Sequence, residues 1–292
     1  MTTIGVLTSS SAVSPELLAQ GIDYWKKRGY AVKESPHLYA CRRFTAGTDE
    51  ERAEDLHTLF ADDKTDIIIQ AGGGYGSSRL LRKIDYDLIA RHKKPLVGLS
   101  DTTALQLALL AKAGLTSLTG YVMKPRAGRV MSPYTEASLD DCLAGREQTV
   151  SGLESDYRGN PIGGTLIGGC LSLVVSVVGT SFFPDPDGAV LILEDVSEEP
   201  YALDRMLTQL ENAGVFDRVA AVVFGVFSDC KAKDPRDGTI DDVLNEWKER
   251  IKVPVFTGLP YGHQAGSLVW PIGGTGVLET GKLTIKGADF YG

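Results

Sequence analysis

The feature that most constrains the fold is an alternation of short apolar runs with amphipathic stretches in the first half of the chain. Strands are expected at Thr3–Leu7, Tyr30–Val32, Asp66–Gln70 and Pro95–Gly98. Helices are expected at Pro15–Arg28, Asp49–Phe60, Tyr86–Arg91 and Asp101–Ala113, with a helical turn from Ser77. Short, fully apolar strands that alternate with helices are typical of a parallel sheet covered on both faces.

The second half has a different pattern, and the length of 292 residues exceeds one average domain of roughly 150 residues. The polar, turn-rich stretch 146–162 is expected to link an N-terminal domain, 1–145, to a C-terminal domain, 163–292. Further strands are expected at 189–193, 219–226 and 253–256, and helices at 201–213, 240–251 and, weakly favoured over a strand, 171–178. The tail, 267–286, resembles a β-meander. The fold class predicted is α/β, with two domains and a β-rich tail.

The net charge and the spacing of the cysteines disfavour several classes of function. The chain carries 30 basic and 38 acidic residues, a net charge of −8, which disfavours nucleic-acid and anionic-membrane partners. No apolar stretch reaches the ~18 residues of a membrane span. The cysteines are far apart, so we expect free thiols and a cytoplasmic protein. Neither they nor the histidines show ligand spacing, so no metal site and no cofactor are expected.

The segment around Ser100 is the first place where chemistry could occur. An apolar strand ends at Gly98, and a helix begins just past Ser100. A serine at a sharp strand-to-helix turn can present its hydroxyl to a substrate, while the N–H of Asp101 lies at the helix N-terminus and can bind an oxyanion. The pattern is Gly-x-Ser-x-Thr rather than Gly-x-Ser-x-Gly. Ser100 can equally be an N-cap, a position that serine favours.

Two further segments place an acid and a base after apolar strands. Glu194 follows Ala189–Leu193, and ligands of open α/β sheets bind beyond the carboxyl ends of strands. His263 lies in the glycine-rich turn Gly258-Leu-Pro-Tyr-Gly-His, and it is the best candidate base among the four histidines. The alternatives are a solvated strand end or helix cap for Glu194 and an exposed turn histidine for His263.

The cluster Gly72–Gly76 follows a strand and precedes a helical turn. Such a loop can offer backbone N–H groups to an anion. It matches neither a dinucleotide-binding fingerprint nor a P-loop, so an oxyanion donor or a tight turn beside a site is favoured over a nucleotide site. Ser100, Glu194 and His263 together then form an acyl-transfer constellation of nucleophile, orienting acid and base.

The sequence around these residues is similar to that of a known family. It resembles the L,D-carboxypeptidases of the muramoyltetrapeptide type, which are serine peptidases, and the murein branch more than the microcin C branch. The resemblance runs nearly end to end and rests on Ile4-Gly-Val-Leu-Thr-Ser-Ser, Gly73-Gly-Tyr-Gly-Ser-Ser-Arg-Leu-Leu, Gly98-Leu-Ser-Asp-Thr-Thr-Ala-Leu, Gly168-Gly-Cys-Leu-Ser-Leu, Leu193-Glu-Asp-Val-Ser-Glu-Glu-Pro-Tyr-Ala-Leu-Asp-Arg-Met-Leu, Gly225-Val-Phe-Ser-Asp-Cys and Gly258-Leu-Pro-Tyr-Gly-His.

The resemblance implies two α/β domains with the site between them. Ser100 would be the nucleophile, Glu194 the orienting acid and His263 the base. The oxyanion hole would combine the N–H of Asp101 with one from Gly73 or Gly74. The implied partners are a cytoplasmic murein tetrapeptide, from which terminal D-Ala is released, and a second copy in a homodimer.

An exopeptidase must also recognise a free carboxylate, and a buried anion favours arginine or a helix N-terminus. Arg79 and Arg205 are the candidates for this role, and Tyr75 is a further candidate for substrate contact. The alternative for the two arginines is a purely structural role, in a salt bridge on the surface or between domains.

Three positions depart from the family pattern: Gly72 replaces an arginine, Cys170 an asparagine, and Tyr121 a proline. None of them is in the constellation, and the first bears on how substrate is held. Competing hypotheses are cleavage of a peptide–nucleotide amide, an α/β-hydrolase esterase, and a non-enzymatic protein that binds murein fragments.

Overall fold

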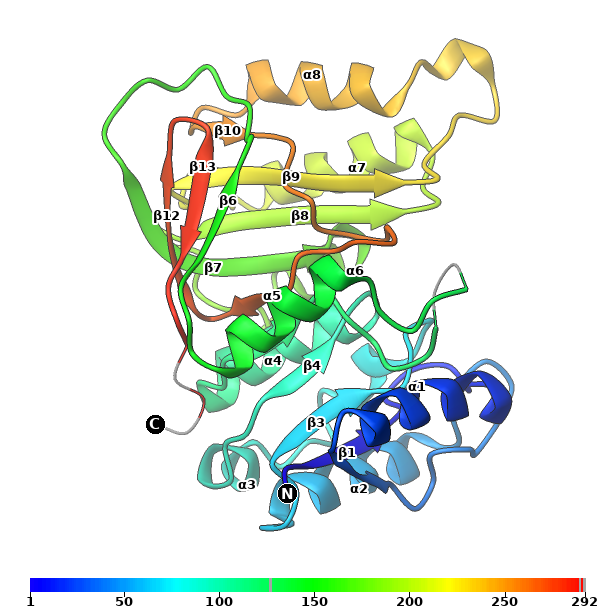
Figure 1. Cartoon of the computed structure of the whole chain (residues 1–292). Coiled ribbons are helices and arrows are strands. Elements are labelled where there is room, and N and C mark those ends of the chain that lie inside the picture. Colours follow the sequence, from blue (N-terminus) through cyan, green and yellow to red (C-terminus); the bar gives the residue numbers. More distant parts are fainter. Residues whose placement is uncertain (126–127, 289, 291–292) are drawn as a thin grey trace.

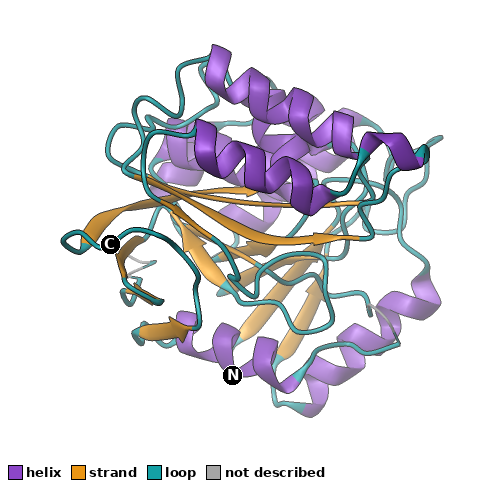
Figure 2. Ribbon diagram, turned by 90° about the horizontal axis from the view of Figure 1, so that it is seen from above, coloured by secondary structure: helices purple, strands orange, loops and turns teal. Residues whose placement is uncertain are grey.

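Two sheets, each flanked by helices, make up the computed structural model, which describes residues 1–125, 128–288 and 290. The N-terminal half lies below and the C-terminal half above in Figure 1. Figure 2 shows the helices on both sides of the strands. The predicted α/β class is therefore confirmed. No helix in the described residues combines the length and the apolar character needed to cross a bilayer.

The lower sheet has six strands in the order β11-β5-β4-β3-β1-β2. Five are parallel: β1 (Thr3–Leu7), β2 (Ala31–Glu34), β3 (Ile67–Gln70), β4 (Leu96–Gly98) and β5 (Ser117–Thr119). The sixth, β11 (Trp270–Ile272), runs antiparallel to β5.

Helices cover both faces of this sheet, as its fully apolar strands require. They are α1 (Pro15–Lys27), α2 (Asp49–Ala61), α3 (Tyr86–Arg91), α4 (Thr102–Ala113) and α5 (Pro133–Leu143), with the 3-10 turn η1 (Ser77–Leu80). Buried side chains of α1 and α5 pack on one face, and those of α2, α3 and α4 on the other. Local signals fix the helix starts: Ser14 caps α1 ahead of Pro15, and Thr48 forms a capping box at α2.

The upper sheet has seven strands in the order β10-β9-β8-β7-β12-β13-β6. They are β6 (Gln148–Ser151), β7 (Ile162–Cys170), β8 (Val190–Val196), β9 (Ala221–Ser228), β10 (Val255–Phe256), β12 (Thr275–Glu279) and β13 (Lys282–Ile285). The strands β7 to β10 run parallel to one another, whereas the pairs β7–β12, β12–β13 and β13–β6 are antiparallel. Its helices are α6 (Leu171–Val177), α7 (Pro200–Asn212), α8 (Ile240–Arg250) and the short η2 (Pro235–Asp237).

The strands and helices expected in residues 1–113 are all present, with ends that agree within two residues. The sequence analysis predicts no element at α5, although Ser132 caps it and Pro133 opens it. The stretch 146–162 contains β6, which pairs with β13. The expected meander is wrong in one respect: β12 and β13 pair with each other, but β11 joins the other sheet.

One continuous core joins the two halves. Buried leucines of α4, in the lower half, belong to the same apolar cluster as the buried residues of α6 and β8 above them. The arrowheads of β8 and β9 point to the right in Figure 1. The carboxyl ends of these strands therefore open on that side of the molecule, where ligands of α/β sheets bind.

Candidate active site

Ser100 lies at a sharp turn between β4 and α4. Its φ of +69° is in the left-handed region that residues other than glycine rarely adopt. The N-cap position of α4 belongs to Asp101, and the Ser100 carbonyl accepts a hydrogen bond from Thr103 N at 2.8 Å. A strained strand-to-helix turn of this kind is the geometry that exposes a nucleophilic serine.

The glycine loop lies directly against Ser100. A Cβ at Gly73 would be 2.9 Å from the Ser100 Cβ and 3.2 Å from its Oγ, so a larger residue could not keep this approach. Gly74 lines the same pocket as Ser100. The backbone of the loop is therefore held beside the hydroxyl, as an oxyanion donor must be.

Asp101 ties this loop to the turn. Its buried Oδ2 accepts hydrogen bonds from Ser10 Oγ at 2.6 Å and from Ser77 N at 2.7 Å. Ser77 Oγ in turn donates to the Asp101 carbonyl. The side chain of Asp101 thus positions the loop, while its own N–H remains the candidate oxyanion donor.

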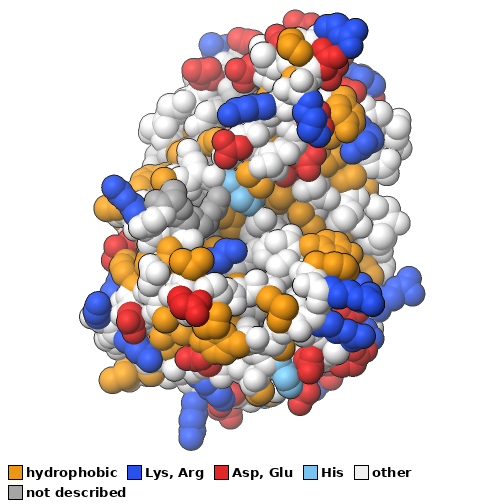
Figure 3. Space-filling model, turned by 90° about the vertical axis from the view of Figure 1, so that its right-hand side faces the viewer, with side chains coloured by type: hydrophobic (Ala, Val, Ile, Leu, Met, Phe, Trp, Pro, Cys, Tyr) orange, Lys and Arg blue, Asp and Glu red, His pale blue; other side chains and the backbone are white. Residues whose placement is uncertain are grey.

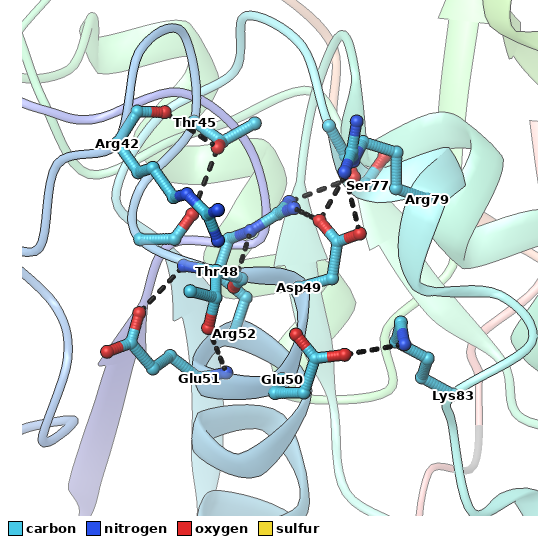
Figure 4. Close-up of polar contacts among 12 residues, drawn as sticks. Arg42, Thr45, Thr48, Asp49, Glu50, Glu51, Arg52, Ser77, Arg79 and Lys83 are labelled. Atoms are coloured by element: carbon cyan, nitrogen blue, oxygen red, sulfur yellow. Dashed lines mark hydrogen bonds and ion pairs between the residues drawn. The ribbon is translucent and has the colours of Figure 1, made fainter.

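A buried arginine holds the far end of the loop. Arg52, only 1% exposed, donates from one nitrogen to the carbonyls of Ser9 and Gly76, the latter at 2.9 Å. A second nitrogen of Arg52, Nη2, pairs with Asp49. The Asp49 carboxylate also accepts hydrogen bonds from Nε and Nη2 of Arg79, at 2.8 and 2.9 Å. Figure 4 shows Arg52 and Arg79 converging on Asp49. Burial lowers the pKa of Arg52, while Asp49 acts in the opposite direction.

In the upper half, His263 bonds to Glu194. His263 Nδ1 lies 2.7 Å from Glu194 Oε2, and the side chains of the two residues are 9% and 0% exposed. A buried carboxylate bonded to one imidazole nitrogen fixes the ring orientation and leaves Nε2 for a substrate.

Tertiary contacts place the turn that carries His263. A parallel bridge joins Gly262 to Val226 of β9, the strand next to β8, which carries Glu194. Tyr261 is fully buried, and its hydroxyl lies 2.8 Å from Thr119 Oγ1 at the end of β5. Burial raises the pKa of Tyr261 well above its usual value, so this hydroxyl stays protonated. The turn is therefore anchored to both halves.

Ser100 and His263 line one pocket between the two halves. Its volume is about 150 Å³, and its described lining residues are Gly73, Gly74, Leu99, Ser100, Val122, Lys124 and His263. Figure 3 looks onto this side and shows a hollow between the upper and lower bodies with a histidine in its wall. Three residues predicted from separate parts of the sequence are thus brought together, two in the pocket and Glu194 directly behind His263.

A larger cavity of about 760 Å³ lies elsewhere, along residues 153–158, 252–255 and 280–281. No histidine or cysteine is among its described lining residues. It holds no nucleophile–base pair among these lining residues, so chemistry rather than size makes the smaller pocket the candidate site.

The three predicted substrate contacts do not line the small pocket in the described residues. Arg79 is bound to Asp49, and Arg205 on α7 lies over the ring of Tyr201. Tyr75, within the glycine loop, is 48% exposed and packs edge-on against Phe44.

The other acids after β8 have different roles. Asp195 accepts from the backbone N–H of Ser172 at 2.7 Å and so satisfies the start of α6. Glu199 pairs with Lys233. Burial raises the pKa of the Cys170 thiol well above its usual value, so this neighbour of Asp195 remains a neutral thiol.

The remaining histidines lie outside the pocket. His57 Nε2 accepts from Asp85 N at 2.9 Å, and His37 bonds to Asp55. His92 lies near an exposed Asp63. Within the described residues, no group of three His, Cys, Asp or Glu side chains is arranged to hold a metal ion.

Lys124 is a pocket residue that the sequence analysis missed. It follows β5 by five residues, at the carboxyl edge of the lower sheet. That position is the signal that could have identified it, because ligands of α/β sheets bind beyond strand ends.

Comparison with known proteins agrees with this arrangement. Residues 4–120 match the LD-carboxypeptidase N-terminal domain and residues 163–278 the LD-carboxypeptidase C-terminal domain of the peptidase S66 family. A probable murein peptide carboxypeptidase of Bacillus subtilis is 33% identical over 97% of this chain and 90% of its own. The murein tetrapeptide carboxypeptidase of Pseudomonas aeruginosa is 31% identical over 96% and 94%.

A solved structure shows the same fold over its whole length. The crystal structure of muramoyltetrapeptide carboxypeptidase from Oxalobacter formigenes has a TM-score of 0.89, 32% identity and 99% coverage of both chains. The microcin C7 self-immunity protein MccF of Escherichia coli is less similar, 25% identical over 93% of this chain and 88% of its own. The chain therefore belongs to the LD-carboxypeptidase family, peptidase S66, and is a serine-type hydrolase of that family.

Proposed function

We propose that this enzyme hydrolyses the L,D-amide bond that releases terminal D-Ala from murein tetrapeptides in peptidoglycan recycling. The observation that carries the proposal is the shared pocket of Ser100 and His263, with Glu194 2.7 Å behind the imidazole. The names of the murein peptide relatives from Bacillus subtilis, Pseudomonas aeruginosa and Oxalobacter formigenes support the substrate.

The first half of the reaction forms an acyl-enzyme. Ser100 Oγ attacks the carbonyl carbon of diaminopimelate, and His263 Nε2 takes the hydroxyl proton while Glu194 stabilises the imidazolium. The carbonyl oxygen becomes an oxyanion, which the N–H groups of Asp101 and of Gly73 or Gly74 stabilise. The C–N bond then breaks, and His263 returns its proton to the amine of the departing D-Ala.

The second half regenerates the enzyme. A water molecule enters the space that D-Ala has left and gives a proton to His263 as its oxygen attacks the ester carbonyl. Collapse of the second tetrahedral intermediate breaks the ester bond, and Ser100 Oγ recovers the proton from His263. The products are a tripeptide carboxylate and D-Ala.

The proposal places this reaction in the cytoplasm and in a homodimer. The four cysteines are all free thiols, as is usual in a reducing compartment. The dimer rests on family resemblance, and gel filtration with light scattering tests it directly.

The test of the proposal compares the wild-type enzyme, Ser100→Ala and Ser176→Ala. Ser176 is an exposed serine on α6 and serves as the matched control. Each protein is incubated with the diaminopimelate tetrapeptide and with its all-L counterpart, and released alanine is measured by mass spectrometry. We expect D-Ala from the wild type and from Ser176→Ala, a loss of at least about 10⁴-fold in Ser100→Ala, and no cleavage of the all-L peptide.

Two outcomes would contradict the proposal. Full activity in Ser100→Ala would show that Ser100 is not the nucleophile. Absence of D-Ala release by the wild type would reject the murein substrate and favour a peptide–nucleotide amide or a binding role, and turnover of aminoacyl sulfamoyl adenosine would separate these two.

A further inference from the structure

We propose that Lys124 binds the free α-carboxylate of the residue that leaves, and thereby makes the pocket select peptide ends. This inference rests on the proposed function, because it assigns the substrate's terminal carboxylate to one side chain of the same site. It replaces Arg79 and Arg205 as the carboxylate anchor.

The first argument is position. Lys124 is the one lysine or arginine among the described residues that line the pocket of Ser100 and His263. Its backbone N–H donates to the Ala71 carbonyl at 2.9 Å, next to the start of the glycine loop. The backbone of Lys124 is thus fixed to the residue that precedes the glycine loop.

The second argument is the state of the charge. Lys124 is half-buried, yet no carboxylate within residues 1–125, 128–288 and 290 forms an ion pair with its ammonium group. Arg79, by contrast, is already saturated by Asp49. In a protein with an excess of acidic residues, a partly desolvated ammonium without a carboxylate is suited to an anionic ligand.

The third argument is the path of the side chain. A Cβ at Gly72 would lie 3.0 Å from the Lys124 Cδ and 3.1 Å from its Cε, and 3.1 Å from the Val13 Cγ1. The stem of Lys124 therefore packs over Gly72, in space that only a glycine leaves open. This packing restricts the stem of a pocket-lining side chain and so limits the entropy lost when its ammonium group binds a ligand.

The fourth argument is the size of the leaving group. Three bonds separate the scissile carbonyl carbon from the terminal carboxylate carbon, a contour of about 4 Å. The carboxylate must therefore find its cation inside the pocket that holds Ser100. The pocket has a volume of only about 150 Å³, which suits a residue as small as alanine.

The experiment measures kcat/KM for the tetrapeptide and for its C-terminal amide in four proteins. They are the wild type, Lys124→Met, Lys124→Arg and the control Lys93→Met, which removes an exposed lysine that precedes β4 and does not line the pocket. We expect the ratio of acid to amide to fall by about 10- to 100-fold in Lys124→Met. Lys124→Arg should keep more of the ratio than Lys124→Met, and Lys93→Met should keep all of it.

Gly72→Ala provides a second variant that retains the lysine. Its methyl group would push against the Lys124 stem, so the acid-to-amide ratio should fall here as well, by less than in Lys124→Met. Circular dichroism and thermal melting show whether each variant is folded before its ratio is used.

The outcomes separate this inference from the proposed function. If the wild type releases D-Ala but Lys124→Met keeps the wild-type ratio, Lys124 is not the anchor and the function stands. A tetrapeptide with lysine as third residue lacks the side-chain carboxylate of diaminopimelate. If Lys124→Met alters only the discrimination between these two peptides, the lysine binds the side chain, and the inference is overturned.

If the wild type releases no D-Ala, the proposed function fails, and binding decides the inference. Calorimetry of Ser100→Ala with the acid and the amide then measures the preference without catalysis. A preference for the acid that disappears in Ser100→Ala/Lys124→Met supports the anchor, whereas the lack of any preference rejects it.

Discussion

At the scale of single residues, the contact between His263 and Glu194 determines which imidazole nitrogen can act. The carboxylate lies 2.7 Å from Nδ1 and is fully buried, so it orients the ring through Nδ1 and leaves Nε2 for the role of base in the proposed mechanism. Glu194 itself stands at a strand end beside three other acids. Its contact with the imidazole of His263 distinguishes it from Asp195, Glu198 and Glu199.

Replacing Glu194 by glutamine tests this arrangement. The amide keeps the shape but can present its NH₂ to Nδ1, which favours the wrong tautomer and removes the charge that stabilises the imidazolium. We expect kcat for D-Ala release to fall by about 10² to 10⁴, with a smaller change in KM. Steady-state kinetics should show wild-type values for the control Glu246→Gln, on the exposed face of α8. An unchanged kcat in Glu194→Gln would exclude the orienting role.

At the scale of elements, the loop between β3 and η1 has no regular structure of its own and depends on its neighbours. Asp101 holds it at Ser77, and Arg52 of α2 holds it at Gly76. The two ends of the loop are thereby fixed while Gly73 stays against Ser100. A preorganised oxyanion loop needs such rigid support, because donors that must reorient stabilise the transition state less.

The two arginines that share Asp49 make a matched pair for measuring this support. Arg52→Met removes a buried guanidinium from three carbonyls and a carboxylate, and should lower the free energy of unfolding by about 3 kcal/mol. Arg79→Met removes the ion pair between Asp49 and Arg79, whose side chain is 45% exposed. This substitution should change the free energy of unfolding by less than about 1 kcal/mol. Urea denaturation followed by circular dichroism gives both values. Equal effects would show that Arg52 stabilises the protein no more than Arg79 does.

At the scale of the whole molecule, the chain returns from the upper half to complete the lower one. The strand β11 adds to the lower sheet at β5, with Trp270 opposite Thr119. The carbonyls of Ser267 and Val269 accept hydrogen bonds from Thr135 and Ser138 of α5. Together with the shared apolar cluster, this exchange makes the relative position of Ser100 and His263 a property of one cooperative unit.

This coupling predicts a single unfolding transition. Trp25 lies in the core of the lower half and Trp247 in that of the upper half, and both are fully buried. Two single-tryptophan proteins, Trp247→Phe/Trp270→Phe and Trp25→Phe/Trp270→Phe, report on each half separately. In each protein, the fluorescence and far-ultraviolet circular dichroism curves in urea should coincide. Two separated transitions would show that the halves unfold independently.

Local sequence patterns specify the strands and helices of residues 1–113 and point to the candidate residues of the site. Capping serines and threonines, apolar strand runs and glycine stops act over a few residues, so local sequence specifies them. Ser100, Glu194 and His263 could be identified as candidates because each follows an apolar strand. Helix α5 was missed although its signals, Ser132 and Pro133, are equally local.

Which strands pair and which charges meet depends on contacts between segments that are distant in the chain. Residues 270–272 have the pattern of any short strand, and their place beside β5 depends on packing with residues more than a hundred positions away. The same holds for the cations. Arg79 is neutralised by a carboxylate thirty positions earlier, whereas Lys124 enters the pocket because Gly72 leaves room for its stem. Contacts of this kind depend on the distance between folded segments, which local sequence patterns do not encode.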